Sequence, residues 1–221
     1  MVNYAVHGHT AGTRFILNAM KRLSCQRCQR PSSHCLCPWL PLQPQHSRSR
    51  IVVLQHPSET KHPLNTARFL SLGLANCELW VGEKFPQLEQ RISDTHYHSA
   101  VLFPNEAPLT LSKASQNSKP WQIFVPDGTW RKAKLLMHLN PTLAELPHLR
   151  LPHGNSAYIF RHSKVPNSHS TLEAVATVLN ALEPKIDTSV LLAPLHRLMA
   201  DQKKAMGESI FQQHYGGSTH G

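Results

Sequence analysis

Residues 121–140 read WQIFVPDGTWRKAKLLMHLN. The first five form an apolar run typical of a buried strand, and the basic stretch that follows has its apolar side chains at helical spacing. Asp127, Gly128, Thr129 and Trp130 therefore stand where a strand gives way to a helix. One interpretation is a turn, in which Asp127 or Thr129 caps the helix and Trp130 enters the core. The other is a site, in which Asp127 acts as a base or orients a basic group and Gly128 lets a ligand approach closely.

On both sides of this stretch, short apolar or β-branched runs alternate with helical patterns. Such alternation is typical of an α/β fold with a mostly parallel sheet flanked by helices. The runs are, in chain order, RIVVLQ, NTARFLSLGL, CELWVG, SAVLF, WQIFV, TWRKAKLLMHL, HLRLP, YIFR and STLEAVATVLNALE.

Helix boundaries are clearest in the C-terminal third. Ser170 and Glu173 have the spacing of a capping box ahead of an apolar stripe, which predicts a helix that begins at Ser170 and ends before Pro184. A last amphipathic helix is predicted from about Thr188 into QKKAMGESIFQQH, with Pro194 setting its first turn or kinking it. A short helix is also predicted within residues 13–23.

Composition limits the class of protein. The chain has 221 residues, 40% of them hydrophobic, which is enough for one main domain with a small appendage. We expect an N-terminal helix with a cysteine-rich element over residues 1–45 and the main domain over 46–221. The formal net charge is +10, which favours a polyanionic partner when it accompanies a site. No apolar run reaches the roughly 18 residues of a membrane span and no signal-peptide pattern occurs, so we expect a cytoplasmic protein without membrane association.

Four cysteines lie close together in the sequence. Cys25, Cys28, Cys35 and Cys37 supply thiols of the kind that zinc binds tetrahedrally, and they predict a structural zinc site with no open coordination position. The last two are separated by a single residue, so His34 is an alternate ligand and a chance cluster of free thiols remains a second interpretation. Cys77 lies in an apparent strand and is predicted to be an inert core residue.

Polar residues follow other predicted strands too. His56 and Glu59 come after IVVLQ, and Pro104 ends SAVLF. If the strands are parallel, these junctions and Asp127 lie at the same carboxyl edge of the sheet, where α/β proteins bind ligands. The helix start at Ser170 and Thr171 would add backbone N–H groups suited to a carboxylate or phosphate. The chain has no phosphate loop, dinucleotide-binding glycine motif, nucleophile elbow or zinc-protease motif, which removes several common enzyme classes.

These motifs together resemble the DTW-domain family of tRNA-uridine aminocarboxypropyltransferases. The resemblance covers residues 25 to about 182, and in this chain DGTW follows Pro126, where a bulkier residue is common. The matching motifs are the four cysteines, LQHPSE at 54–59, LNTARFL at 64–70, LFP at 102–104, DGTW at 127–130 and STLEA at 170–174.

The resemblance implies a SPOUT-like, trefoil-knotted domain that takes S-adenosylmethionine as donor. The 3-amino-3-carboxypropyl group would be transferred to N3 of a tRNA uridine, leaving methylthioadenosine. It implies Asp127 and Trp130 as catalytic residues. The expected donor-binding residues are Phe103, Pro104, Asp127, Gly128, Thr129, Ser170, Thr171 and Glu173, and the expected RNA-binding residues are His56, Glu59, Arg68, Arg131, Lys132, Lys134 and Arg161.

Two other functions fit the same residues. One is an RNA methyltransferase of the same fold class, and the other is a zinc-stabilised RNA-binding module without catalysis. An acid-lined pocket at strand ends favours an enzyme over the module. The sequence predicts no oligomeric state.

Overall fold

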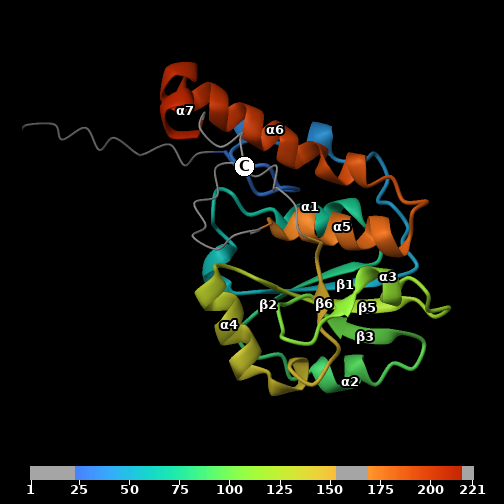
Figure 1. The fold of residues 1–221 in the computed structure, drawn as a ribbon. Helices are drawn as coiled ribbons and strands as arrows, with labels where there is room; N and C mark the ends of the chain where they lie inside the picture. The colour runs from blue at the N-terminus through green and yellow to red at the C-terminus, as the bar shows by residue number, and fades with distance from the viewer. Residues whose placement is uncertain (1–22, 153–168, 216–221) are drawn as a thin grey trace, which may run out of the picture.

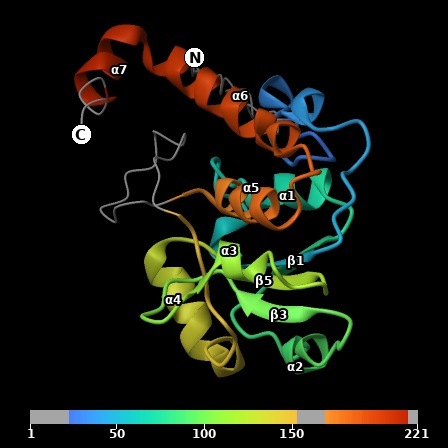
Figure 2. The same cartoon turned by 45° about the vertical axis from the view of Figure 1, so that its right-hand side comes forward.

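A computed structural model describes residues 23–152 and 169–215 of the chain. A four-stranded sheet lies at the centre, α1 and α5 cover one face of it, and α2 and α4 lie on the other (Figure 1). Helix α6 packs outside α1 and α5, so it forms a further layer, which a view turned by 45° also shows (Figure 2). The predicted helix within 13–23 lies outside the described residues except for its last position. The predicted strand YIFR at 158–161 lies entirely outside them.

The sheet is parallel throughout, as the alternating pattern predicts. Its strand order is β2-β1-β5-β3, and the end of β1 is in register with the end of β5, where Gln55 lies beside Asp127. A second, two-stranded parallel sheet pairs β4 with β6. The strands are β1 (Arg50–Gln55), β2 (Cys77–Val81), β3 (His98–Val101), β4 (Leu109–Thr110), β5 (Trp121–Asp127) and β6 (Leu149–Arg150).

The described helices include several short ones. They are α1 (Ala67–Gly73), α2 (Leu88–Ile92), α3 (Leu111–Ala114), α4 (Trp130–Leu139), α5 (Thr171–Leu182), α6 (Thr188–Met206) and α7 (Glu208–Tyr215), with 3-10 turns η1 (Ser32–His34), η2 (Cys37–Trp39), η3 (Pro57–Glu59) and η4 (Pro141–Leu143). None of the helices in the described segments combines the length and the apolar character that crossing a bilayer requires.

Strands β1 and β5 are apolar along most of their length because both faces of the sheet are covered. Ile51 and Val53 face the core shared with α1, α5 and α6, whereas Val52 and Leu54 face the core shared with α2 and α4. Side chains that alternate between two buried faces give a continuous apolar run. Full burial of each such side chain contributes about 1.5–3 kcal/mol.

The two C-terminal predictions have different outcomes. The capping box at Ser170 is present, and α5 ends where Glu183 caps it. The single last helix is wrong: α6 stops at Gly207, whose positive φ of 85° turns the chain, and α7 follows as a separate helix. Pro194 is buried in the second turn of α6, so it does not set the first turn.

The cysteine-rich segment packs onto the main core. Leu36 and Leu40 are buried in the same cluster as α6 residues, and the Arg197 guanidinium lies 4.4 Å from the centre of the Trp39 ring. The first and last described parts of the chain therefore stabilise each other.

Candidate active site

Asp127 is the last residue of β5 and is only 9% exposed. Gln55 donates a hydrogen bond from Nε2 to Asp127 Oδ2 at 2.8 Å, and Thr171 donates from its hydroxyl to Oδ1. Parallel pairing of β1 with β5 places Gln55 there, and the start of α5 supplies Thr171. Donors from two separate elements thus hold the carboxylate in one orientation at the carboxyl edge of the sheet.

Gln55 also links Asp127 to the loop between β1 and α1. Its Nε2 also lies 3.3 Å from Asn65 Oδ1, and Asn65 donates to the Glu59 carbonyl at 3.0 Å. The Oε1 atom of Gln55 is buried and has no hydrogen-bond partner in the described parts of the chain. Sequence reasoning missed Gln55, because the register that brings it to Asp127 joins residues 72 positions apart.

Gly128 allows the chain to turn tightly after Asp127. Its φ is 156°, and a Cβ atom there would lie 3.0 Å from Lys132 Cβ. Close by, Lys132 Nζ and Glu59 Oε1 form an ion pair at 2.6 Å, which ties η3 to the first turn of α4. Lys132 and Glu59 were both predicted to contact RNA, and in the structure they form an ion pair with each other.

Trp130 begins α4, and Thr129 caps that helix by accepting from the Lys132 backbone N–H. The Trp130 ring lies 6.0 Å from the Phe103 ring between centroids, and His148 Nδ1 lies 2.9 Å from the Phe103 carbonyl oxygen. Trp130 Nε1 is buried with no partner among the described residues. The rings of Trp130 and Phe103 therefore form an aromatic wall beside the turn, and Trp130 Nε1 is its available donor. The sequence predicted Trp130 and Phe103 as site residues but not His148.

At the start of α5, Ser170 and Glu173 cap the helix by bonding to each other. The Ser170 hydroxyl accepts from Glu173 N at 3.2 Å, and Glu173 Oε2 accepts from Ser170 N at 2.8 Å. Both residues are buried. Of the three residues predicted here, Thr171 is the one whose side chain reaches Asp127.

The other predicted contacts are spread around this edge. His56 Nε2 lies 3.1 Å from Glu83 Oε1, which joins the ends of β1 and β2. Arg131 and Lys134 are exposed on α4, and Pro104 is exposed after Phe103. Arg68 lies on α1, and Arg161 falls outside the described residues.

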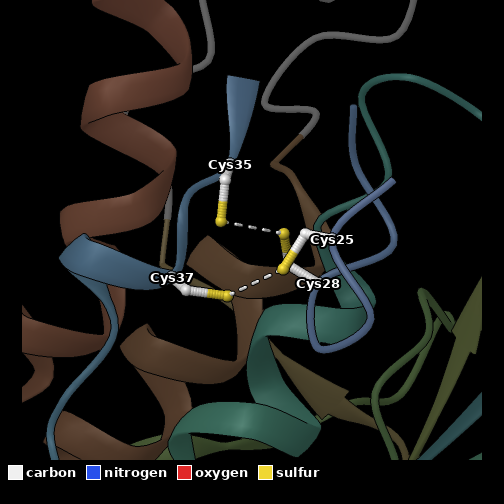
Figure 3. A group of neighbouring side chains, drawn as sticks. All are labelled: Cys25, Cys28, Cys35 and Cys37. Atoms are coloured by element: carbon white, nitrogen blue, oxygen red, sulfur yellow. Dashed lines mark hydrogen bonds between the residues drawn. The ribbon is translucent and has the colours of Figure 1, made fainter. Parts of the chain in front are cut away.

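The four cysteines converge on one point (Figure 3). All four sulfur atoms lie within 4.8 Å of one another, and the Cys25–Cys37 and Cys28–Cys35 sulfur pairs are each 3.7 Å apart. Zn–S bonds of about 2.3 Å at tetrahedral angles put sulfur atoms about 3.8 Å apart, so the arrangement fits zinc. The Nδ1 atom of His34 lies 2.9 Å from the Ser33 hydroxyl, and this residue is not among the four that converge.

The cysteine thiols differ in acidity. The backbone N–H groups of Cys28 and then Arg27 lower the pKa of Cys25 to about 6, whereas burial raises the pKa of Cys37 to about 12. Burial likewise raises the pKa of Cys77 in β2 to about 12. Cys25 therefore offers a thiolate near neutral pH.

The protein is an α/β protein with a parallel sheet, a buried carboxylate at the carboxyl ends of its strands and a four-cysteine cluster. The carboxyl ends of the strands are where α/β enzymes bind their ligands. The DTW domain profile matches residues 22–203, so the chain belongs to the DTW domain family.

Named relatives agree with this assignment. The chain is 36% identical to "tRNA-uridine aminocarboxypropyltransferase 2" of Drosophila melanogaster over 80% of this chain and 74% of that protein. It is 31% identical to the protein of the same name from Macaca fascicularis, over 83% of this chain but 65% of the relative. It is 27% identical to "tRNA-uridine aminocarboxypropyltransferase A" of Arabidopsis thaliana, over 74% of each chain. No solved structure matches the chain.

Proposed function

We propose that this protein transfers the 3-amino-3-carboxypropyl group of S-adenosylmethionine to N3 of a uridine in tRNA. The family and the names of its relatives support the reaction class. The observation that carries the proposal is the buried Asp127 carboxylate, oriented by Gln55 and Thr171 beside an aromatic wall. We expect the protein to act in the cytoplasm, with tRNA as its partner.

Asp127 is proposed as the general base. Uridine N3 carries a proton and becomes a good nucleophile only when that proton leaves. Gln55 and Thr171 each donate a hydrogen bond to the Asp127 carboxylate, and an ionised carboxylate has several acceptor positions, so it is proposed to accept the N3 proton as well. The new bond joins N3 to the carbon that leaves sulfur, sulfur keeps the electron pair of the broken bond, and the products are the modified uridine, methylthioadenosine and a proton.

The bound donor supplies an electrophilic carbon attached to a sulfonium. We propose that Phe103, Pro104 and Trp130 border its adenosine or the uracil ring, with Gly128 and Thr129 forming the adjoining turn. Trp130 Nε1 and Gln55 Oε1, a buried donor and a buried acceptor with no partner among the described residues, fit such an arrangement because a ligand could bond both.

The start of α5 suits the methionine carboxylate of the donor. The capping box of Ser170 and Glu173 uses the N–H groups of those two residues. Among the described residues, no hydrogen bond uses the backbone N–H groups of Thr171 and Leu172, which lie at the positive end of the helix dipole. These two groups are proposed to hold the carboxylate.

Exposed cations beside the turn are proposed to meet the RNA backbone. Arg131 and Lys134 are exposed on α4, the helix that follows Asp127, and Arg161, which lies outside the described residues, is proposed as a third RNA contact. Lys132 can contact RNA only by exchanging its partner Glu59. His56 and Glu59 are proposed to hold the loops at this edge in place.

The four cysteines are proposed to hold a structural zinc ion, which would cross-link residues 25–37 without taking part in the chemistry.

We further propose that the chain divides into an N-terminal element over residues 1–45 and a main domain over 46–221, and that the main domain is SPOUT-like and trefoil-knotted. The parallel sheet and the return of α5 to the end of β5 support the SPOUT-like assignment. A crystal structure that traces the backbone from β6 to α5 tests the knot.

Mass spectrometry of the products tests the reaction. The purified protein is incubated with S-adenosylmethionine and an unmodified tRNA transcript. Methylthioadenosine together with a uridine heavier by one aminocarboxypropyl group is the expected result. S-adenosylhomocysteine with a methylated nucleoside would instead indicate the RNA methyltransferase, and tight tRNA binding without any product would indicate the RNA-binding module.

A further inference from the structure

A pocket of about 580 Å³ lies between the cysteine-rich element and the loop that joins β1 to α1. One wall comes from the segment after Cys28 and the other from the segment between η3 and α1. The side chains that give it its character are Arg30, His34, Lys61, His62, Asn65 and Arg68. Neither wall belongs to the turn that holds Asp127.

The pocket is strongly positive. Arg30, Lys61 and Arg68 line it, and no Asp or Glu is among the described residues that do. No hydrogen bond or ion pair between described residues uses the side chain of Lys61 or Arg68. Glu59 is close in sequence, but its carboxylate is paired with Lys132 at 2.6 Å. Within the described parts of the chain, no acidic side chain therefore pairs with Lys61 or Arg68.

Hydrogen-bond donors dominate the lining. His62 Nδ1 accepts from the Leu64 backbone N–H, which leaves Nε2 as the protonated ring nitrogen in the neutral form. Arg30 donates from Nε to the His34 carbonyl and from its terminal nitrogen to the Pro63 carbonyl, so it fastens the two walls to each other. Arg30, held by these two bonds, and the side chains of Lys61 and Arg68 give the pocket cationic donors, and no acid lines it among the described residues; a phosphate group prefers such surroundings.

The pocket is connected to the candidate active site. Asn65 lines it and also binds Gln55, which holds Asp127. A group bound in the pocket is thus one side chain away from the residues that orient the proposed base. The wall on the other side contains Cys28, so the cysteine cluster shapes the pocket.

We propose that this pocket binds a phosphate of the RNA backbone and fixes the tRNA relative to Asp127. This inference rests on the proposed function, since tRNA is taken as the substrate. The donor is a poor occupant, because its sulfonium and ammonium groups outweigh its single carboxylate and the pocket cations would repel it. RNA also supplies many phosphates, which makes its binding sensitive to salt.

The test compares tRNA binding by wild-type protein, the double variant Lys61→Ala/Arg68→Ala and the control Lys113→Ala. Lys113 is exposed on α3 and does not line the pocket. Affinity is measured by fluorescence anisotropy with an unmodified tRNA transcript over a series of KCl concentrations. Each lost phosphate contact is expected to reduce the slope of log affinity against log salt by about 0.7–0.9. The double variant should therefore bind more weakly with a shallower slope, whereas the control should match the wild type.

Further arms separate the alternatives. Lys61→Glu changes an exposed side chain, and it should weaken tRNA binding with no change in the thermal unfolding midpoint. An unchanged affinity and slope in both pocket variants would overturn the proposal. So would weaker S-adenosylmethionine binding with normal tRNA binding, or saturation by inorganic phosphate that leaves tRNA affinity unaffected.

The pocket and the proposed reaction fail in different ways. If the wild type forms the aminocarboxypropyl product while the pocket variants bind tRNA normally, the pocket proposal is wrong and the function stands. If the pocket variants lose tRNA affinity but the wild type forms no such product, the pocket stands and the function is wrong.

Discussion

The Asp127 carboxylate accepts hydrogen bonds from Gln55 and Thr171, so the contribution of each group can be tested by replacing single atoms. Asp127→Asn keeps the shape but removes the base. General bases contribute about 10²–10⁴-fold, so we expect turnover to fall by at least about 100-fold. Isothermal titration with S-adenosylmethionine should show an affinity within a few-fold of wild type. The exposed Glu145 provides a matched control, and Glu145→Gln should leave turnover unchanged. Retained turnover in Asp127→Asn would remove the assignment of the base.

Thr171 is a positioning residue for Asp127, and its role depends on the hydroxyl rather than on its volume. Thr171→Val removes the donor at nearly constant shape, whereas Thr171→Ser keeps it. A hydrogen bond to a charged group is worth about 1.5–3 kcal/mol, so we expect the Val variant to lose about 10- to 100-fold in kcat and the Ser variant to stay close to wild type. Equal losses in both variants, measured in steady-state assays with saturating donor, would mean that packing is what matters.

At this scale the sequence indicates chemistry better than geometry. Asp127, Trp130 and Thr171 belong to motifs whose residue types already suggest a site. Gln55 is the last residue of an apolar strand, and its role follows only from the register of β1 against β5. His148 reaches Phe103 through a loop whose path no local pattern specifies.

Whole elements show the same division between what is local and what is distant. The capping box of α5 lies within four neighbouring residues, so it was predictable. The break between α6 and α7 was missed because an apolar periodicity continues across Gly207, while the turn depends on the backbone conformation of that glycine. The convergence of four thiols is local too, since they lie within residues 25–37.

The cysteine element should respond as a unit to removal of its metal. With zinc bound, we expect all four thiols to resist alkylation, and after treatment with a strong chelator we expect Cys25 to react first at neutral pH, because its pKa is about 6. Cys77 should remain slow until the protein unfolds, because its pKa is about 12. Mass-resolved iodoacetamide labelling measures these rates. Four thiols that react equally fast before and after chelation would argue against a metal site.

The molecule as a whole uses the two edges of its sheet differently. The carboxyl edge gathers the candidate site, whereas the amino edge is held by charged contacts. Arg50 begins β1, and its guanidinium donates to Asp94 at 3.0 Å and to Gln122 of β5 at 2.9 Å. A parallel sheet flanked by helices was predictable from the alternating pattern, but the strand order was not, because pairing depends on contacts between distant segments.

Because of Asp94 at this amino edge, the free energy of unfolding should depend on pH in the acid range. Arg50, together with the His96 backbone N–H, holds the pKa of Asp94 at about 2, below its usual 3.8. A carboxyl whose pKa is lower in the folded state stabilises the protein above its unfolded pKa and loses that effect as pH falls from about 4 toward about 2. Asp94→Asn should therefore be less stable than wild type at pH 7, with the difference shrinking below pH 4. Urea unfolding from pH 3 to pH 7 measures it, and a difference independent of pH would contradict the assignment.

The contacts around Asp127 also order events during synthesis. Asp127 pairs with Gln55 from 72 residues earlier and with Thr171 from 44 residues later. A ribosome that adds about 5–20 residues per second makes β1 wait roughly 4–14 s for β5 and then further seconds for α5. The carboxylate is thus set in place only after α5 has left the exit tunnel. We expect a nascent chain that stops before residue 170 to be inactive, so that no half-made copy modifies the tRNAs crowded around the ribosome.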